Sequence, residues 1–176
     1  MYYNKPYMFI NWVIILINKV FNAMLEYFSG DPKRIQHFIK VHAFAAAIAE
    51  GEGMQNDERR TLEIAALVHD IGIKVSEVKH NSSAGKYQEL EGPAEADKLL
   101  TSLGVERAVI DRVCYLVGHH HTYKDITELD YQILVEADFL VNLYEDNESR
   151  ESALRVKDKI FKTETGKRFI STIYEI

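Results

Sequence analysis

Histidine and aspartate side chains interrupt some of the most apolar segments of the chain. His69 and Asp70 follow the run AALV, and Asp138 lies inside the segment ILVEADFLVNL. His37 shares a helix face with small apolar residues one and two turns later. A buried, ionised aspartate is costly unless a cation, a set of hydrogen-bond donors or a metal ion compensates for its charge. These four side chains therefore need partners in the folded protein.

One divalent metal ion would provide a partner for all four side chains. Imidazole nitrogen and carboxylate oxygen are good ligands for Fe, Mn, Zn and similar ions. Ligands from different helices can meet in the interior of a helical bundle. His69 and Asp70 are expected near the C-terminal end of a helix, where the helix dipole favours a cation. We therefore predict a metal site made by His37, His69, Asp70 and Asp138.

The elements that must position these ligands show a helical period throughout. Asp31 and Pro32 form a helix-start signal, and Gly51 and Gly53 form a helix-stop signal. Helices are expected over residues 11–28, 32–50, 57–71 and 106–119, from Gly92 and from residue 127, and after residue 150, with no strand. Asp57 is the expected cap of the third helix, and residues 165–166 are a candidate break in the tail. Residues 71–90 are polar without an apolar period, which predicts a binding loop or lid. The fold class is therefore expected to be all-α in a single domain.

The order of the four predicted ligands resembles the H…HD…D signature of the HD superfamily of metal-dependent phosphohydrolases. The segments RIQHFIKVHAFAAAIA, AALVHDIG and ILVEADFLVNL are similar to that family's first-ligand helix, HD helix and final aspartate helix. The resemblance implies an HD-domain helical bundle over residues 31–145. Residues 1–30 would then form an N-terminal helix that could be an extension, and residues 146–176 would form C-terminal helices packed on the same domain.

The resemblance also implies a second set of ligands. Some branches of the family hold two metal ions, with the aspartate of the HD pair bridging them. Their extra ligands are a histidine before a Gly-Pro helix start and one or two later histidines. Here Glu91 stands before the Gly-Pro pair in place of that histidine, and the spacing favours His120 and His121 over His119. Whether Asp70 holds one ion or bridges two is left open, and Fe, Mn, Co, Ni, Zn and Mg are all candidates.

The activity implied by the resemblance is hydrolysis of a small phosphorylated molecule, with nucleotides as the favoured class. A bound metal lowers the pKa of its water and so supplies hydroxide near neutral pH. Asp70 is the expected catalytic centre. Lys74, displaced by one position from the family's usual lysine, would hold a substrate phosphate, and a solvated surface role is nearly as favourable. The alternatives are a di-iron oxygenase and a regulatory metal-binding module without turnover.

Composition limits the kinds of binding partner and the cellular compartment that we expect for this chain. The chain has 176 residues and a net charge of -6, so a sequence-independent nucleic-acid binder, which needs a basic face, is not expected. The single cysteine, Cys114, excludes an intramolecular disulfide and fits the cytoplasm. Residues 7–17 are strongly apolar but shorter than the ~20 residues that span a bilayer.

This apolar segment is expected to form a packed first helix without stable membrane insertion. A signal anchor is the minority alternative, and a homodimer formed through the helix would be another way to cover it. Met24 is an alternative start of the natural protein.

Overall fold

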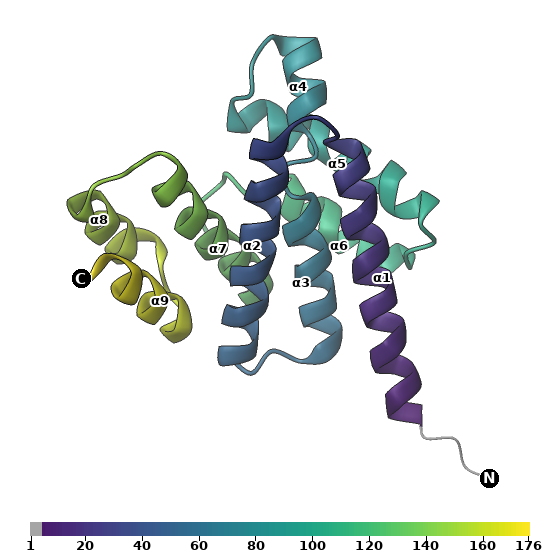
Figure 1. Cartoon of the computed structure of the whole chain (residues 1–176), viewed down its shortest axis with the longest axis horizontal. Helices are drawn as coiled ribbons and strands as arrows, with labels where there is room; N and C mark the ends of the chain where they lie inside the picture. Colours follow the sequence, from purple (N-terminus) through teal and green to yellow (C-terminus); the bar gives the residue numbers. More distant parts are fainter. Residues whose placement is uncertain (1–4) are drawn as a thin grey trace.

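The computed structural model describes residues 5–176, and the side chains from residue 15 onward. Within that range it contains nine helices and no strand (Figure 1). The helices are α1 (Lys5–Tyr27), α2 (Pro32–Gly51), α3 (Asn56–Val68), α4 (Ile73–His80), α5 (Gly85–Ser102), α6 (Arg107–Val117), α7 (Leu129–Glu145), α8 (Arg150–Ile160) and α9 (Glu164–Tyr174). The expected all-α fold is confirmed.

Helix α3 lies in the interior of the bundle, in contact with α1, α2, α6 and α7 (Figure 1). Residues 64–68, the last five residues of the helix, have no exposed surface. Because neighbouring helices cover every side of this segment, its sequence is apolar all round rather than amphipathic. The helix therefore delivers the two residues that follow it, His69 and Asp70, into the interior of the protein.

Side-chain caps fix where two of the helices begin. The Asp31 carboxylate accepts a hydrogen bond from the backbone N–H of Arg34, at 3.1 Å, and Pro32 takes the first helical position of α2. Thr163 caps α9 in the same way, so the break in the C-terminal tail precedes Glu164 and does not fall at residues 165–166 as expected. Helix α3 begins one residue before Asp57, which lies in its first turn instead of capping it.

The segment 71–90 is not the loop that its composition suggested. Helix α4 and the beginning of α5 occupy most of it, and only residues 81–84 separate them. The buried face of α4 consists of Ile73 and Ser76, which is too narrow to produce an apolar period. Helix α5 begins at Gly85 and continues through Pro93, although a proline inside a helix removes one backbone hydrogen bond. The expected helix start at Gly92 is therefore wrong, because α5 begins seven residues earlier.

Gly72 allows α5 to approach closely the turn that follows α3. A Cβ atom at this position would lie 2.6 Å from the Gln88 carbonyl oxygen and 2.8 Å from the Gly92 backbone nitrogen. Both atoms are backbone, so they can yield only if α5 shifts. We expect Gly72→Ala to lower the free energy of unfolding by about 1–3 kcal/mol, as overpacking does. Urea denaturation measures this loss, and an unchanged midpoint would contradict it.

The apolar N-terminal segment is part of α1, which begins at Lys5 and not near residue 11 as expected. Its second half packs on the core through Leu16, Val20, Met24 and Phe28, which recur every four residues. The side chains of residues 5–14 lie outside the described ones, so packing of residues 7–14 on the domain or on a second copy stays a prediction. Among the described residues, none of the helices combines the length and the apolar character needed to cross a membrane.

Candidate metal centre

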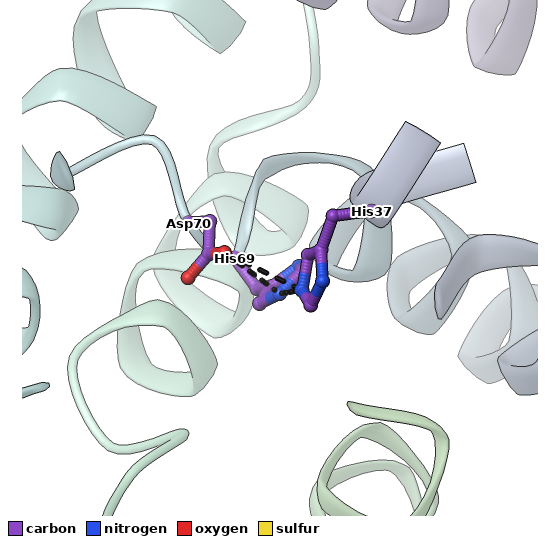
Figure 2. A group of neighbouring side chains, drawn as sticks. All are labelled: His37, His69 and Asp70. Carbon is purple, nitrogen blue, oxygen red and sulfur yellow. Dashed lines mark hydrogen bonds and ion pairs between the residues drawn. The ribbon is translucent and has the colours of Figure 1, made fainter. Parts of the chain in front are cut away.

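Four side chains from three parts of the chain meet inside the bundle. His37 comes from α2, His69 and Asp70 from the turn after α3, and Asp138 from α7. His37 Nε2 lies 3.2 Å from His69 Nε2, 3.4 Å from Asp70 Oδ2 and 3.2 Å from Asp138 Oδ1. Figure 2 shows the His37 ring directed toward His69 and Asp70. The structure thus brings together all four residues that the sequence predicts as ligands.

The rings of two histidines are oriented by backbone carbonyl groups. His69 Nδ1 donates to the Ala66 carbonyl oxygen at 2.9 Å, and His120 Nδ1 donates to the Val117 carbonyl oxygen at 2.8 Å. A carbonyl oxygen can only accept, so each Nδ1 carries a proton, and in the neutral ring the lone pair is on Nε2. Both Nε2 atoms face the aspartates. This arrangement of a histidine with an outer hydrogen-bond acceptor is typical of metal ligands.

His37 is oriented by a carboxylate instead of a carbonyl. Its Nδ1 lies 3.1 Å from Glu145 Oε2, and Lys40 Nζ lies 2.7 Å from Glu145 Oε1. A carboxylate partner makes the imidazole a stronger donor to a metal than a carbonyl partner does. Sequence analysis missed Glu145, although it lies two helical turns after Asp138 and therefore on the same face of α7.

Replacing Glu145 with alanine should weaken metal binding by about 10- to 100-fold, the usual cost of losing such an outer partner. Glu145→Gln keeps a carbonyl oxygen that can accept from His37 Nδ1, so its loss should be smaller. Competition with a chromogenic chelator measures both affinities, with the exposed Glu151→Ala as the control. Equal affinities of Glu145→Ala and the unmodified protein would show that Glu145 does not position His37.

A second group of candidate ligands shares Asp70 with the first. One ligand atom each of Asp70, His120 and His121 lie within 4.8 Å of one another. His120 Nε2 and His121 Nε2 are buried and make no hydrogen bond within the described part of the chain. A buried nitrogen left without a partner costs about 1–3 kcal/mol, which a bound cation would offset. His119 turns away and donates to the Tyr115 carbonyl oxygen at 2.7 Å. The donor set therefore fits a divalent metal on either side of Asp70.

The charges of these groups favour ionised carboxylates at the centre. Burial alone would lower the pKa of His37, but its hydrogen bond to Asp138 and the charge of Asp70 outweigh burial and raise it to about 9. Burial opposes ionisation of Asp70 and Asp138, yet the surrounding imidazoles hold the pKa of both carboxyls below their usual range. Burial and the charge of His120 lower the pKa of His121 to about 4. His121 is therefore neutral near pH 7, which is the form that binds metals.

Two further residues that the resemblance implied lie apart from these groups. The Glu91 carboxylate pairs with Lys79 Nζ at 2.6 Å and with His80 Nε2 at 2.9 Å. Lys74 Nζ donates to the Tyr27 carbonyl oxygen and lies 5.1 Å from the centre of the Tyr27 ring. Among the described residues, neither belongs to a group of candidate ligands. Their roles as a second-ion ligand and as a phosphate-binding cation stay predictions, and each role would require another rotamer.

An open cavity of about 360 Å³ leads from the surface to His37 and Asp70. Its other polar lining residues come from the start of α2 and its cap, from the segment before α5 and the first turn of α5, and from the end of α7 and its C-cap; they are Asp31, Lys33, Arg34, Ser83, Gln88, Asn142, Glu145 and Asp146. The cavity gives water and a small polar molecule a route to the candidate ligands. Its mixture of cationic, anionic and amide groups suits a charged substrate that also carries hydroxyl or amino groups.

Known proteins share this arrangement at the level of a family. The family model for the HD domain matches residues 34–160, a range that includes all four ligands of the first group. The chain is also similar to the crystal structure of a predicted HD superfamily hydrolase from an uncultured Thermotogales bacterium. The two are 26% identical with a TM-score of 0.65, and the match covers 90% of this chain and 84% of that chain. No curated protein matches the chain.

Proposed function

Since the chain belongs to the HD-domain family, we propose that it hydrolyses a small phosphorylated molecule, such as a nucleotide, with the help of a divalent metal. The observation that carries the proposal is the meeting of His37, His69, Asp70 and Asp138 at the end of an open cavity. A polar cluster that served only packing would not need the route to solvent. It would also not leave the nearby His121 Nε2 buried without a hydrogen bond or ion pair in the described chain.

Some residues of the protein would hold the metal ions, and others would bind the substrate phosphate. A divalent ion bound here would lower the pKa of a coordinated water and neutralise phosphate oxygens. Asp70 faces both ligand groups, because Oδ2 lies 3.4 Å from His37 Nε2 and Oδ1 lies 3.4 Å from His120 Nε2. One oxygen on each side suits a bridging ligand, so the proposal includes two ions. Lys74 would bind a substrate phosphate after leaving the Tyr27 carbonyl.

The proposal is tested by a hydrolysis screen over nucleotides and simple phosphate esters. The purified chain is loaded separately with Mn, Fe, Co, Ni or Mg, and its metal content is measured by elemental analysis. We expect at least one metal to support release of inorganic phosphate, and we expect EDTA to abolish this release. A protein that is loaded with metal but releases phosphate from none of these compounds would overturn the proposal.

Glu91 remains a proposed ligand of the second ion, although it pairs with Lys79 and His80. If it ligates, Glu91→Ala should reduce the metal content from two ions per chain toward one, because a carboxylate ligand is lost. Elemental analysis of the variant measures this ratio, and Glu95→Ala on the same helix is a control. An unchanged ratio would mean that Glu91 only anchors the end of α4.

The proposed location of this activity is the cytoplasm. Cys114 is the single cysteine of the chain, and its thiol is half-buried and donates to the Pro93 carbonyl oxygen at 3.3 Å. A chain whose only thiol is held in this way is suited to a reducing compartment, where structural disulfides are rare.

A further inference from the structure

A second cavity adjoins the one at the metal centre. It has a volume of about 410 Å³ and lies between α7 and α8, within the ~300–1,000 Å³ range of pockets that bind small organic ligands. Asn142 and Asp146, near the end of α7, line both cavities. The two cavities therefore share a wall. A molecule that passed over these two residues would reach from the metal centre into the space that we call the α7–α8 groove.

The floor of the α7–α8 groove is apolar. Phe139 and Leu143 of α7 face Val156 and Ile160 of α8 across it. The Phe139 ring packs against the Tyr123 ring, with 5.0 Å between their centres, so its position is fixed from behind. A floor of one aromatic ring and three aliphatic side chains suits the flat face of an aromatic group.

The side of the groove formed by α8 carries two cations one helical turn apart. Arg155 and Lys159 are exposed and line the groove, and neither has a carboxylate partner among the described residues. Arg155 Nη2 instead donates to the neutral Ser152 Oγ at 2.8 Å. Two basic residues beside the metal centre differ, because Arg34 pairs with Glu77 and Lys40 pairs with Glu145. Lys33, which lines the metal-centre cavity, is also exposed and unpaired among the described residues, so α8 supplies a second position for an anion, with two cations.

Acidic residues also line the groove and limit where an anion can bind. Asp146 and Glu148 belong to the turn between α7 and α8, and they form no ion pair with the α8 cations in the described chain. They would repel an anion from that turn. Arg155 and Lys159 can hold a phosphate with charge-assisted hydrogen bonds, which are about twice as strong as neutral ones.

We propose that the α7–α8 groove binds the distal part of the substrate. This part consists of a nucleobase and a second phosphate that are attached to the same sugar. The substrate class is then a nucleoside that carries two separate phosphates, one at the metal centre and one at Arg155 and Lys159. The inference rests on the proposed function in one respect, which is the placement of the first phosphate at the metal centre. The base, the second phosphate and their binding residues are assigned from the groove itself.

The test measures binding without turnover, by calorimetry on the full chain loaded with Ca²⁺ in place of a metal that supports hydrolysis. The probes are adenosine 3′,5′-bisphosphate, adenosine 5′-monophosphate and ribose 5-phosphate. The double variant Arg155→Gln/Lys159→Gln should bind the bisphosphate at least about tenfold more weakly, because two charge-assisted contacts are lost. The monophosphate should bind this variant and the unmodified protein equally. Ribose 5-phosphate should bind more weakly than the monophosphate, because it lacks the base that covers the apolar floor.

The control has the same loss of charge at positions away from both cavities. Lys19→Gln/Lys98→Gln replaces two exposed lysines on α1 and α5, and its affinity for the bisphosphate should not change. Equal affinities of the groove variant and the unmodified protein would overturn the inference, and so would equal weakening in the control. A separate hydrolysis assay with metal decides the proposed function. If affinity depends on the groove but no phosphate ester is hydrolysed, the proposed function is wrong and the inference that the groove binds this ligand stands.

Discussion

Asp70→Ala is expected to remove metal binding from the protein and to abolish phosphate release. Its carboxylate lies at the centre of both ligand groups, within 3.6 Å of His69 Nε2 and 3.4 Å of His120 Nε2. Removing it takes one ligand from each group and leaves Asp138 as the one carboxylate of these groups beside four imidazoles. The loss of activity should therefore exceed the about 100-fold that removal of an outer partner typically costs. Elemental analysis and phosphate release measure the two effects.

The control for this change is another aspartate that is paired and exposed. Asp111→Ala removes a carboxylate from Arg107, which retains its ion pair with Asp97 at 2.7 Å, so metal content should not change. Circular dichroism shows whether each variant is folded. A folded Asp70→Ala protein that retains a stoichiometric amount of metal would disprove the assignment of Asp70 as a ligand.

Glu136→Ala is expected to cause the largest loss of stability. The Glu136 side chain is fully buried on α7, and Oε1 accepts hydrogen bonds from the backbone N–H groups of Lys162 and Thr163 at 2.6 Å and 2.9 Å. It also accepts from Gln132 Nε2 and from the Thr163 hydroxyl. Alanine would remove this partner from the two backbone N–H groups and the Thr163 hydroxyl, at about 1–3 kcal/mol each, whereas Gln132 keeps its bond to the Ile160 carbonyl oxygen. We expect the free energy of unfolding to fall by about 3 kcal/mol or more, as measured by urea denaturation.

Glu136→Gln separates the hydrogen bonds from the charge. The amide oxygen can still accept from the two backbone N–H groups, so this variant should lose less stability than Glu136→Ala. Its metal content should be normal, because Glu136 belongs to neither ligand group in the described residues. A loss below about 1 kcal/mol for Glu136→Ala would show that water replaces the carboxylate at the start of α9.

The meeting of the four candidate ligands of the first group could be predicted because burial leaves a clear trace in the sequence. Helix α3 is apolar on every side at its end, so His69 and Asp70 stand out against it. Asp138 stands out in α7 for the same reason, since its neighbours Ala137 and Val135 are fully buried. Polar residues that interrupt such segments must have partners, and this physical requirement predicted that the four side chains meet, without knowledge of the fold.

Other features of the molecule could not be predicted from the sequence, because they depend on contacts between distant segments. Helix α4 buries too few residues to show a period, and its place is set by Gly72 and the approach of α5. In the sequence Glu145 resembles any surface glutamate, but its side chain is only 13% exposed and contacts His37. The Glu91 side chain is held by Lys79 and His80, whose positions depend on α4. Side-chain direction in these cases follows from packing that a linear pattern does not encode.

The positions of the ligands in the chain also bear on how the protein would respond to metal supply. His37 on α2 and Asp138 on α7 are separated in sequence by helices α3 to α6, yet their side chains lie 3.2 Å apart. An ion held between them would act as a reversible cross-link between two helices that are distant in the sequence and packed together. At 100 times its Kd it would add about 2.7 kcal/mol to the stability of the folded chain. Starvation for metal would then shorten the lifetime of the protein as well as silence it.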